Sequence, residues 1–301
     1  MTALIWLVLY FALGILGRRS GRLPDSTASF LNALVIDVCL PAVVLAQVPK
    51  LSFDRGLLFP VLMPWIFFAF GAFFFWGAGR VLRLPTKTLG CLILVAGMGN
   101  TSFVGFPLIE AFYGKEHLST GVMVDQPGSF LLLATVGVFT ALAFSSGKWS
   151  GKLLLKKVFL FPPFVALLLA LALLPFSYPA WVQSLLSFLG SLLSPIALFS
   201  VGFQLRVADL KDHRPPLILG LLYKLLLGPL LIAFLYVFLL KASGKVIQVT
   251  LFEAAMPPMI SAGILATENR LDPPLAVLLM GIGIPLSFLT VPLAWVLLQR
   301  I

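Results

Sequence analysis

The chain is dominated by long, continuous apolar runs that are separated by short polar connections. Hydrophobic residues make up 60% of its 301 residues and charged residues only 11%. A water-soluble fold of this length cannot cover so much apolar surface, whereas a helix of about 20 apolar residues crosses the hydrocarbon core of a bilayer. The runs do not alternate between apolar and polar positions, as the strands of a membrane barrel do. The sequence therefore predicts an all-α integral membrane protein.

Ten of these runs are long enough to be transmembrane helices. They lie near residues 2–17, 27–47, 56–78, 90–113, 121–145, 158–176, 182–205, 215–240, 246–267 and 276–298. No basic segment precedes the first run, so we interpret it as the first span and not as a cleaved signal.

The distribution of Lys and Arg supports a count of ten spans. Fourteen of the 21 Lys and Arg fall in every second connection, six fall in the other connections and the chain ends, and Lys224 lies inside a run. Cytoplasmic loops carry the excess of positive charge. We therefore expect both termini on the non-cytoplasmic side and the basic connection 147–157 in the cytoplasm. The net charge of +10 follows from these loops and does not indicate a nucleic-acid partner.

The ten runs divide into two halves of five, residues 1–146 and 158–301. Because five is odd, two such halves in series enter the membrane in opposite orientations, which defines an inverted repeat. Short strings recur between the halves, such as Pro127-Gly-Ser-Phe-Leu and Pro285-Leu-Ser-Phe-Leu, which are 158 residues apart. We predict two inverted five-helix repeats joined by the basic connection.

The fourth and ninth runs are interrupted near their middles. Residues 97–107 read Gly-Met-Gly-Asn-Thr-Ser-Phe-Val-Gly-Phe-Pro, and residues 256–259 read Met-Pro-Pro-Met. Glycine loosens a helix, and proline removes a backbone donor. Backbone groups left open in lipid are costly, so an interrupted helix must face protein or a water-filled cavity. In carriers, such broken helices form the binding site near the middle of the membrane.

If the two breaks cross, two half-helix N-termini with free N–H groups and positive dipole ends face one cavity. Such ends favour an anion, and a carboxylate is the natural guest. The candidate substrate-binding residues lie at or beside the breaks: Gly99, Asn100, Thr101, Ser102, Pro107, Pro257, Pro258 and Ser261. The alternative interpretation is that each break is an ordinary kink, because Gly and Pro are common in membrane helices.

Four ionisable residues inside the runs are candidates for ion coupling, because charge within a bilayer is costly. Glu253, one turn before Pro257, fits three roles: a Na⁺ ligand, a proton relay, or a protonated side chain bonded to loose backbone. Asp37 is either a scaffold residue bonded to a neighbouring helix or part of the pathway. Asp125 is expected to be solvated near the outer face. Lys224 either balances a bound anion, pairs with an acid, or extends to the membrane interface.

The two breaks carry a resemblance to the auxin efflux carrier family, which includes the plant PIN-FORMED carriers and bacterial malonate and malate carriers. Asn-Thr-Ser-Phe-Val-Gly-Phe-Pro-Leu (100–108), followed by Ala-Phe-Tyr-Gly (111–114), fits the family pattern at the first crossing. Ala-Met-Pro-Pro-Met (255–259), followed by Ala-Thr-Glu-Asn (266–269), resembles the second. The similarity runs the full length of the chain.

The resemblance implies a fold like that of the bile acid/sodium symporters. In that fold, spans 1, 2, 6 and 7 form a scaffold that also joins two copies in a homodimer. Spans 3–5 and 8–10 form a mobile transport unit, in which 4 and 9 cross. Span 5, which begins near Asp125, packs against this crossing in the resembled fold, which is the alternative to a solvated Asp125. The resemblance further implies that Asn100 contacts the substrate carboxylate and that Pro257 is the proline of the second crossing.

Departures from the plant members narrow the expected substrate. Plant members have Gln in place of Pro258 and a long cytoplasmic loop in place of residues 147–157. The chain therefore resembles a compact bacterial member of the inner membrane, for which an aromatic auxin is not the expected substrate. Phe252-Glu253 resembles the Na⁺-binding glutamate of the sodium-coupled relatives. The Gln-Asn pair that follows it there is missing here, which ranks a proton above Na⁺.

Together these observations favour a secondary carrier of a small organic anion, a carboxylate, that works by alternating access with elevator-like motion. The alternatives are a sodium-coupled symporter of the bile acid type and a membrane sensor that binds its ligand without transporting it. An enzyme is not indicated, since the usual catalytic motifs are absent. We expect no cofactor or metal beyond a coupling H⁺ or Na⁺, and we expect Cys39 and Cys91 to be buried small side chains.

Overall fold

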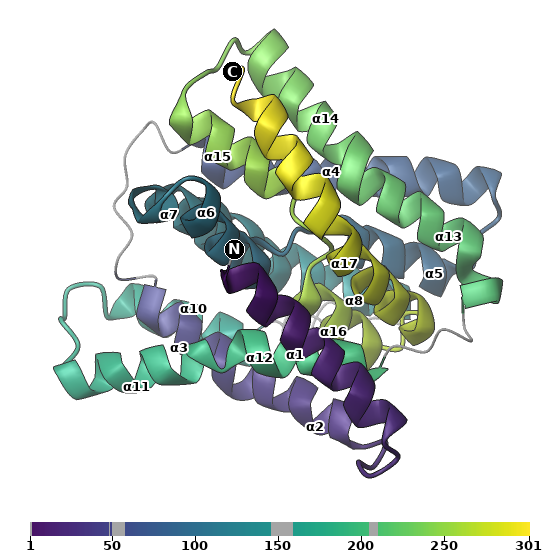
Figure 1. The fold of residues 1–301 in the computed structure, drawn as a ribbon, viewed down its shortest axis with the longest axis horizontal. Coiled ribbons are helices and arrows are strands. Elements are labelled where there is room, and N and C mark those ends of the chain that lie inside the picture. The colour runs from purple at the N-terminus through teal and green to yellow at the C-terminus, as the bar shows by residue number, and fades with distance from the viewer. Residues whose placement is uncertain (1, 48, 50–57, 146–158, 205–209) are drawn as a thin grey trace.

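The computed structural model describes residues 2–47, 49, 58–145, 159–204 and 210–301, and every regular element within them is a helix (Figure 1). The predicted cytoplasmic connection 147–157 lies outside these ranges. Six helical segments of the described residues are long and apolar enough to cross a bilayer, namely Thr27–Ala46, Leu58–Val81, Leu118–Ser145, Ala180–Gln204, His213–Leu239 and Pro273–Leu298. The all-α membrane class is therefore confirmed, whereas the count of ten spans and the inverted repeat stay predictions.

The helix boundaries follow the predicted apolar runs closely. In the first half the elements are α1 (Thr2–Arg19), α2 (Thr27–Leu34), η1 (Val35–Cys39), α3 (Leu40–Gln47), α4 (Leu58–Val81), α5 (Thr86–Cys91), η4 (Leu92–Ala96), η5 (Thr101–Gly105), α6 (Phe106–Phe112), η6 (Lys115–His117), α7 (Leu118–Met123), η7 (Val124–Phe130), η8 (Leu133–Gly137) and α8 (Val138–Ser145).

In the second half the elements are α10 (Pro162–Ala172), α11 (Ala180–Ser191), α12 (Leu193–Gln204), α13 (Leu210–Leu222), η10 (Tyr223–Leu227), α14 (Gly228–Ala233), η11 (Phe234–Leu239), α15 (Lys245–Ala254), α16 (Ile260–Glu268) and α17 (Pro273–Leu298). All the η elements except η6, a short 3₁₀ turn, are π-helical turns within longer helices. Wide turns of this kind often mark functional positions in helices.

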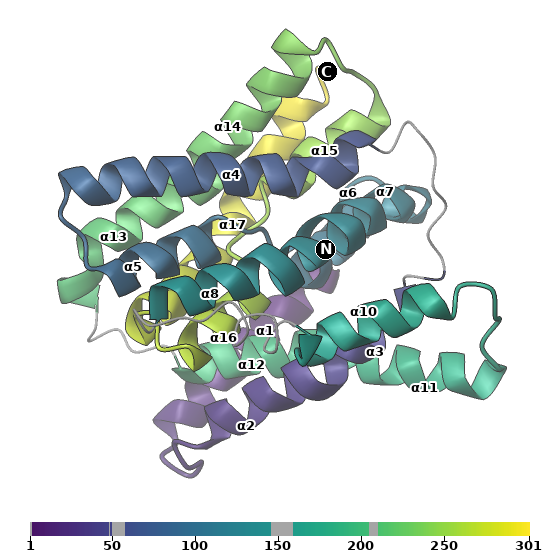
Figure 2. The same ribbon diagram turned by 180° about the vertical axis from the view of Figure 1, so that it is seen from behind.

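The helices form two packed groups (Figures 1 and 2). In one group, α1 packs along α12, α2 packs against α12, and α3 packs against α10 and α11. In the other, α4 packs against η7 and α15, and α17 packs against α13 and α16. The action of the first group as a scaffold and of the second as a mobile unit stays a prediction.

Two glycines allow α1 and α12 to approach closely. A Cβ atom at Gly14 would collide with the backbone of Phe199, and one at Gly202 would collide with the backbone of Phe11. Small residues at such positions let the backbones of membrane helices touch, so that van der Waals contact joins them. The backbones of α1 and α12 are therefore in direct contact at Gly14 and Gly202.

Candidate substrate site

Two helices of the second group are interrupted at the predicted places. The helix formed by α5 and η4 ends at Ala96 and the chain resumes as a helix at Thr101. Likewise, α15 ends at Ala254 and α16 begins at Ile260. Glycines in the first gap and adjacent prolines in the second explain why neither helix continues.

The two gaps contact each other through their backbones. The N–H of Asn100 donates to the carbonyl of Pro257 over 2.9 Å, and the N–H of Met259 donates to the carbonyl of Met98 over 3.2 Å. These bonds pair Gly99 with Pro258 in an antiparallel bridge. The predicted meeting of the two breaks is therefore confirmed. Each gap satisfies donors and acceptors of the other, which lipid could not do.

Asn100 is placed to cap the helix that follows it, yet its side chain makes no capping hydrogen bond. The side chain is buried, and neither its Nδ2 nor its Oδ1 has a partner among the described residues. The same holds for the hydroxyls of Ser129 and Ser261. A buried polar group without a partner costs about 1–3 kcal/mol, so groups like these are expected to bind water or a ligand.

Thr101 belongs to a second polar cluster, in which the Asp125 carboxylate accepts two hydrogen bonds and Oε1 of Gln126 has no partner among the described residues. Its hydroxyl donates to Oδ1 of Asp125 over 2.5 Å, and the Gln126 amide donates to Oδ2 over 2.7 Å. Asp125 is 2% exposed. The expectation that Asp125 is solvated is therefore wrong. The position lies on the η7 turn that packs against η5, and the crossing covers it. Ser102 also lies close to this carboxyl.

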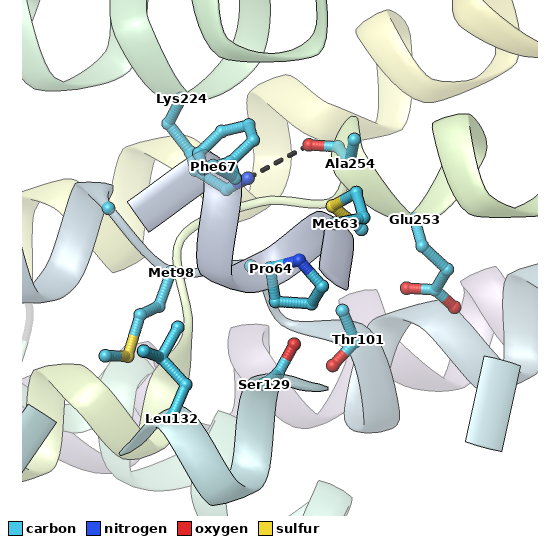
Figure 3. A pocket seen from close by; sticks show the side chains of 12 residues that line it. Met63, Pro64, Phe67, Met98, Thr101, Ser129, Leu132, Lys224, Glu253 and Ala254 are labelled. Carbon is cyan, nitrogen blue, oxygen red and sulfur yellow. Dashed lines mark hydrogen bonds between the residues drawn. The ribbon is translucent and has the colours of Figure 1, made fainter. Parts of the chain in front are cut away.

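Lys224 lies at the crossing and not at a membrane interface. Its side chain is 1% exposed, and its ammonium donates to the carbonyl of Ala254 over 3.0 Å (Figure 3). The ammonium also lies 3.9 Å from the centre of the Phe67 ring, which is a cation–π contact. The interpretation that Lys224 extends to an interface is therefore wrong, because η10 aims the side chain into the helix group.

Glu253 is fully buried, and neither of its carboxyl oxygens has a hydrogen-bond partner among the described residues. The carboxyl lies against Gly105, where a Cβ atom would be 2.5 and 2.6 Å from its two oxygens. It interacts electrostatically with Asp125 and Lys224. An acid without hydrogen bonds in such a place must be protonated or be balanced by a nearby cation.

A small cavity lies among four of these residues, Thr101, Ser129, Lys224 and Glu253 (Figure 3). Asn100 is not a lining residue but lies between two that are, Gly99 and Thr101. It is lined by Met63, Pro64, Phe67, Gly97, Met98, Gly99, Thr101, Ser129, Leu132, Lys224, Glu253 and Ala254. Its free space accommodates about one water molecule. The described conformation is therefore closed around the crossing, with one basic and one acidic side chain in the wall.

Asp37 and Pro107 are the remaining predicted residues. Asp37 is exposed on η1 and lines a separate groove with Glu268 and Asn269. The structure therefore does not bring Asp37 to the crossing. Pro107 lies in the first turn of α6, and its side chain is outside the described set. Cys39 and Cys91 are buried and free, as predicted.

Ser129, Phe67 and the Met63-Pro64 pair were missed as candidate site residues in the sequence. Ser129 belongs to the recurring Pro127-Gly-Ser-Phe-Leu string, which was the available signal. Its η7 turn packs against α4, which brings Met63 and Phe67 to the same cavity. Nothing in the composition of α4 marks those residues, because the helix is apolar on every side.

The fold and the candidate site together indicate the class of protein to which the chain belongs. A multi-pass helical protein whose two broken helices meet at a buried polar crossing has the architecture of a membrane transporter. A family model described as "Membrane transport protein" matches residues 1–295, and the chain belongs to that family. This confirms the relationship that the motifs of the two breaks predict. The protein is a transporter and not an enzyme.

Two archaeal proteins are similar to this chain over nearly its full length. One is an uncharacterized transporter of Methanocaldococcus jannaschii, 26% identical, with 99% of each chain covered. The other is an uncharacterized transporter of Methanothermobacter thermautotrophicus, 29% identical, with 93% of this chain and 92% of the relative covered.

Proposed function

We propose that the protein is a secondary carrier of a small organic anion, a carboxylate, which it binds at the crossing of the two broken helices. The observation that carries this proposal is the buried side-chain amide of Asn100, which lies at a helix start and has no hydrogen-bond partner among the described residues. A carboxylate offers the acceptor that this amide and the adjacent helix N-terminus favour. The ammonium of Lys224 supplies a positive charge in the wall of the adjacent cavity, which is also lined by Gly99 and Thr101 on either side of Asn100.

Charge balance at the crossing favours ion coupling. Asp125, Glu253 and Lys224 are all buried, and Glu253 interacts electrostatically with both of the others, so an incoming carboxylate adds a third acid to a single base. Uncompensated charge in a dry site is costly. A proton on Glu253 lowers that cost, and a bound Na⁺ does the same. We therefore propose that the anion binds together with a compensating cation, with the proton preferred.

The transport cycle that fits this fold is alternating access. We propose ten spans in two inverted repeats, with the group around α4 and α17 moving against the group around α1 and α12. Two copies associate through the group around α1 and α12. Both termini face away from the cytoplasm of a plasma membrane, in accord with the Lys and Arg distribution. The closed cavity fits an occluded step of such a cycle.

A binding experiment tests the site. Thermal unfolding of the purified protein in detergent is followed with a panel of mono- and dicarboxylates, and the anion that stabilises it is titrated. Asn100→Ala is expected to weaken that anion about 10–100-fold, since one hydrogen bond to a charged group is lost. Asn269→Ala is the matched control, because the Asn269 side chain donates to the carbonyl of Leu265 at the end of α16 and does not line the cavity at the crossing. Equal affinity in Asn100→Ala and the wild type removes Asn100 from the site.

A further inference from the structure

The ammonium of Lys224 lies at the C-terminal end of the half-helix α15, where it donates to a backbone carbonyl. The π-helical turn η10 carries Lys224 within the long helical segment His213–Leu239. Its acceptor, the carbonyl of Ala254, is the last of α15, directly before the break. The last carbonyls of a helix have no partner within the helix and carry partial negative charge. The lysine therefore fills an electrostatic position that favours a cation.

In secondary transporters, half-helix C-termini and unwound carbonyls coordinate the coupling cation, whereas half-helix N-termini face the anionic substrate. This crossing presents both kinds of end. Asn100 lies at the N-terminal kind, and the Ala254 carbonyl lies at the C-terminal kind. The cation position of the crossing is thus taken by a side chain of the protein itself.

The surroundings of the ammonium suit a tethered cation. The centre of the Phe67 ring lies 3.9 Å from the Lys224 nitrogen. Gly99 leaves room for the ammonium, because a Cβ atom at this position would lie only 3.3 Å from the same nitrogen. The charged groups that face it are Glu253 of α15 and, beyond it, Asp125 of η7. Among the described residues, no carboxylate lies within ion-pair distance of Lys224. The ammonium therefore acts through the carbonyl and the ring, as a bound ion does.

We propose that Lys224 is a built-in replacement for a coupling cation at the C-terminal end of α15, and that the carrier therefore works without Na⁺. The position of the ammonium and its consequence for cation binding do not depend on what the protein transports. The consequence for coupling rests on the proposed carrier function. Deleting the lysine side chain should open a site of matching charge and size for a small monovalent cation.

The test uses the full chain purified in detergent, with no anion present. Thermal unfolding of the wild type, Lys224→Ala and Lys224→Met is measured in choline, Na⁺, K⁺ and methylammonium chlorides at equal ionic strength. The wild type is expected to unfold at one temperature in all four salts. Lys224→Ala is expected to unfold earlier in choline and to recover by at least about 2 °C, saturably, in methylammonium or Na⁺. Lys224→Met, which fills the space without charge, is expected to show no recovery.

Two results overturn the proposal. One is a saturable stabilisation of the wild type by Na⁺, because the cation position would then still be open. The other is a Lys224→Ala protein that no small cation stabilises, or that equals the wild type in choline. If Lys224→Ala cannot be purified, Na⁺ and choline are compared on the wild type alone, and Na⁺-dependent stability or flux overturns the proposal. Absence of any carboxylate flux contradicts the carrier function but leaves the cation result standing.

Discussion

At the scale of single residues, the packing of the crossing depends on glycines, because the absence of a side chain leaves space for neighbouring groups. Gly105 has the backbone geometry of an ordinary right-handed helix, with φ of −62° as the helix cap. Alanine would be acceptable there if the Glu253 carboxyl did not occupy the space of its Cβ. The glycine therefore serves to seat a buried acid rather than to bend the chain.

Gly105→Ala is expected to lower the unfolding temperature and the flux, because the methyl group displaces the Glu253 carboxyl from its seat. Gly77→Ala is the control, since a Cβ atom at Gly77 of α4 meets nothing within 4 Å and alanine favours a helix by up to about 1 kcal/mol. Adding Glu253→Asp to Gly105→Ala shortens the acid and should recover part of the loss. No difference between Gly105→Ala and Gly77→Ala in thermal unfolding would show that Glu253 moves freely.

Thr101→Val is expected to destabilise the protein by about 1–3 kcal/mol, because the buried carboxyl of Asp125 loses the donor that lies 2.5 Å away. Thr101→Ser keeps the hydroxyl and should lose much less. Chemical unfolding in mixed detergent compares the two variants. The account requires the valine variant to be the weaker, and equal losses would assign the effect to packing of the methyl group.

At the scale of elements, the sequence predicts where the helices begin and end. It does not predict which helices pack together or which side chains face a neighbouring helix. The breaks were predictable, since Gly97, Gly99 and the Pro257-Pro258 pair have direct backbone consequences. The residues alone did not decide whether Lys224 and Asp125 are buried or lie at an interface. Depth within a membrane and orientation toward a neighbour depend on packing between helices, and a single lysine in an apolar run fits either an interface or a core.

The close contact of α1 and α12 makes a prediction at this scale. Gly14→Val and Gly202→Val should each force the two backbones apart and lower the unfolding temperature strongly, since the new side chain meets backbone and not a movable side chain. Gly77→Val, which meets open space, controls for the cost of valine in a helix. If the three variants unfold alike, α1 and α12 are not held by this contact.

At the scale of the whole molecule, the charge distribution predicts which ends face the cytoplasm. Ser20 lies in a connection expected inside, and Ser243 in one expected outside; both residues are exposed. The native Cys39 and Cys91 are buried, so they should give little background. In intact cells, a membrane-impermeant thiol reagent should label Ser243→Cys and not Ser20→Cys. The reverse pattern would invert the proposed topology.

The central claim is that a small carboxylate bound at the crossing of the two broken helices is carried across the membrane. The most direct test is counterflow in proteoliposomes, with the labelled anion that stabilises the purified protein. The account predicts saturable uptake by the wild type and by Asn269→Ala, and uptake reduced at least about tenfold in Asn100→Ala at subsaturating anion. Saturable binding without uptake, or uptake that Asn100→Ala leaves unchanged, would contradict it.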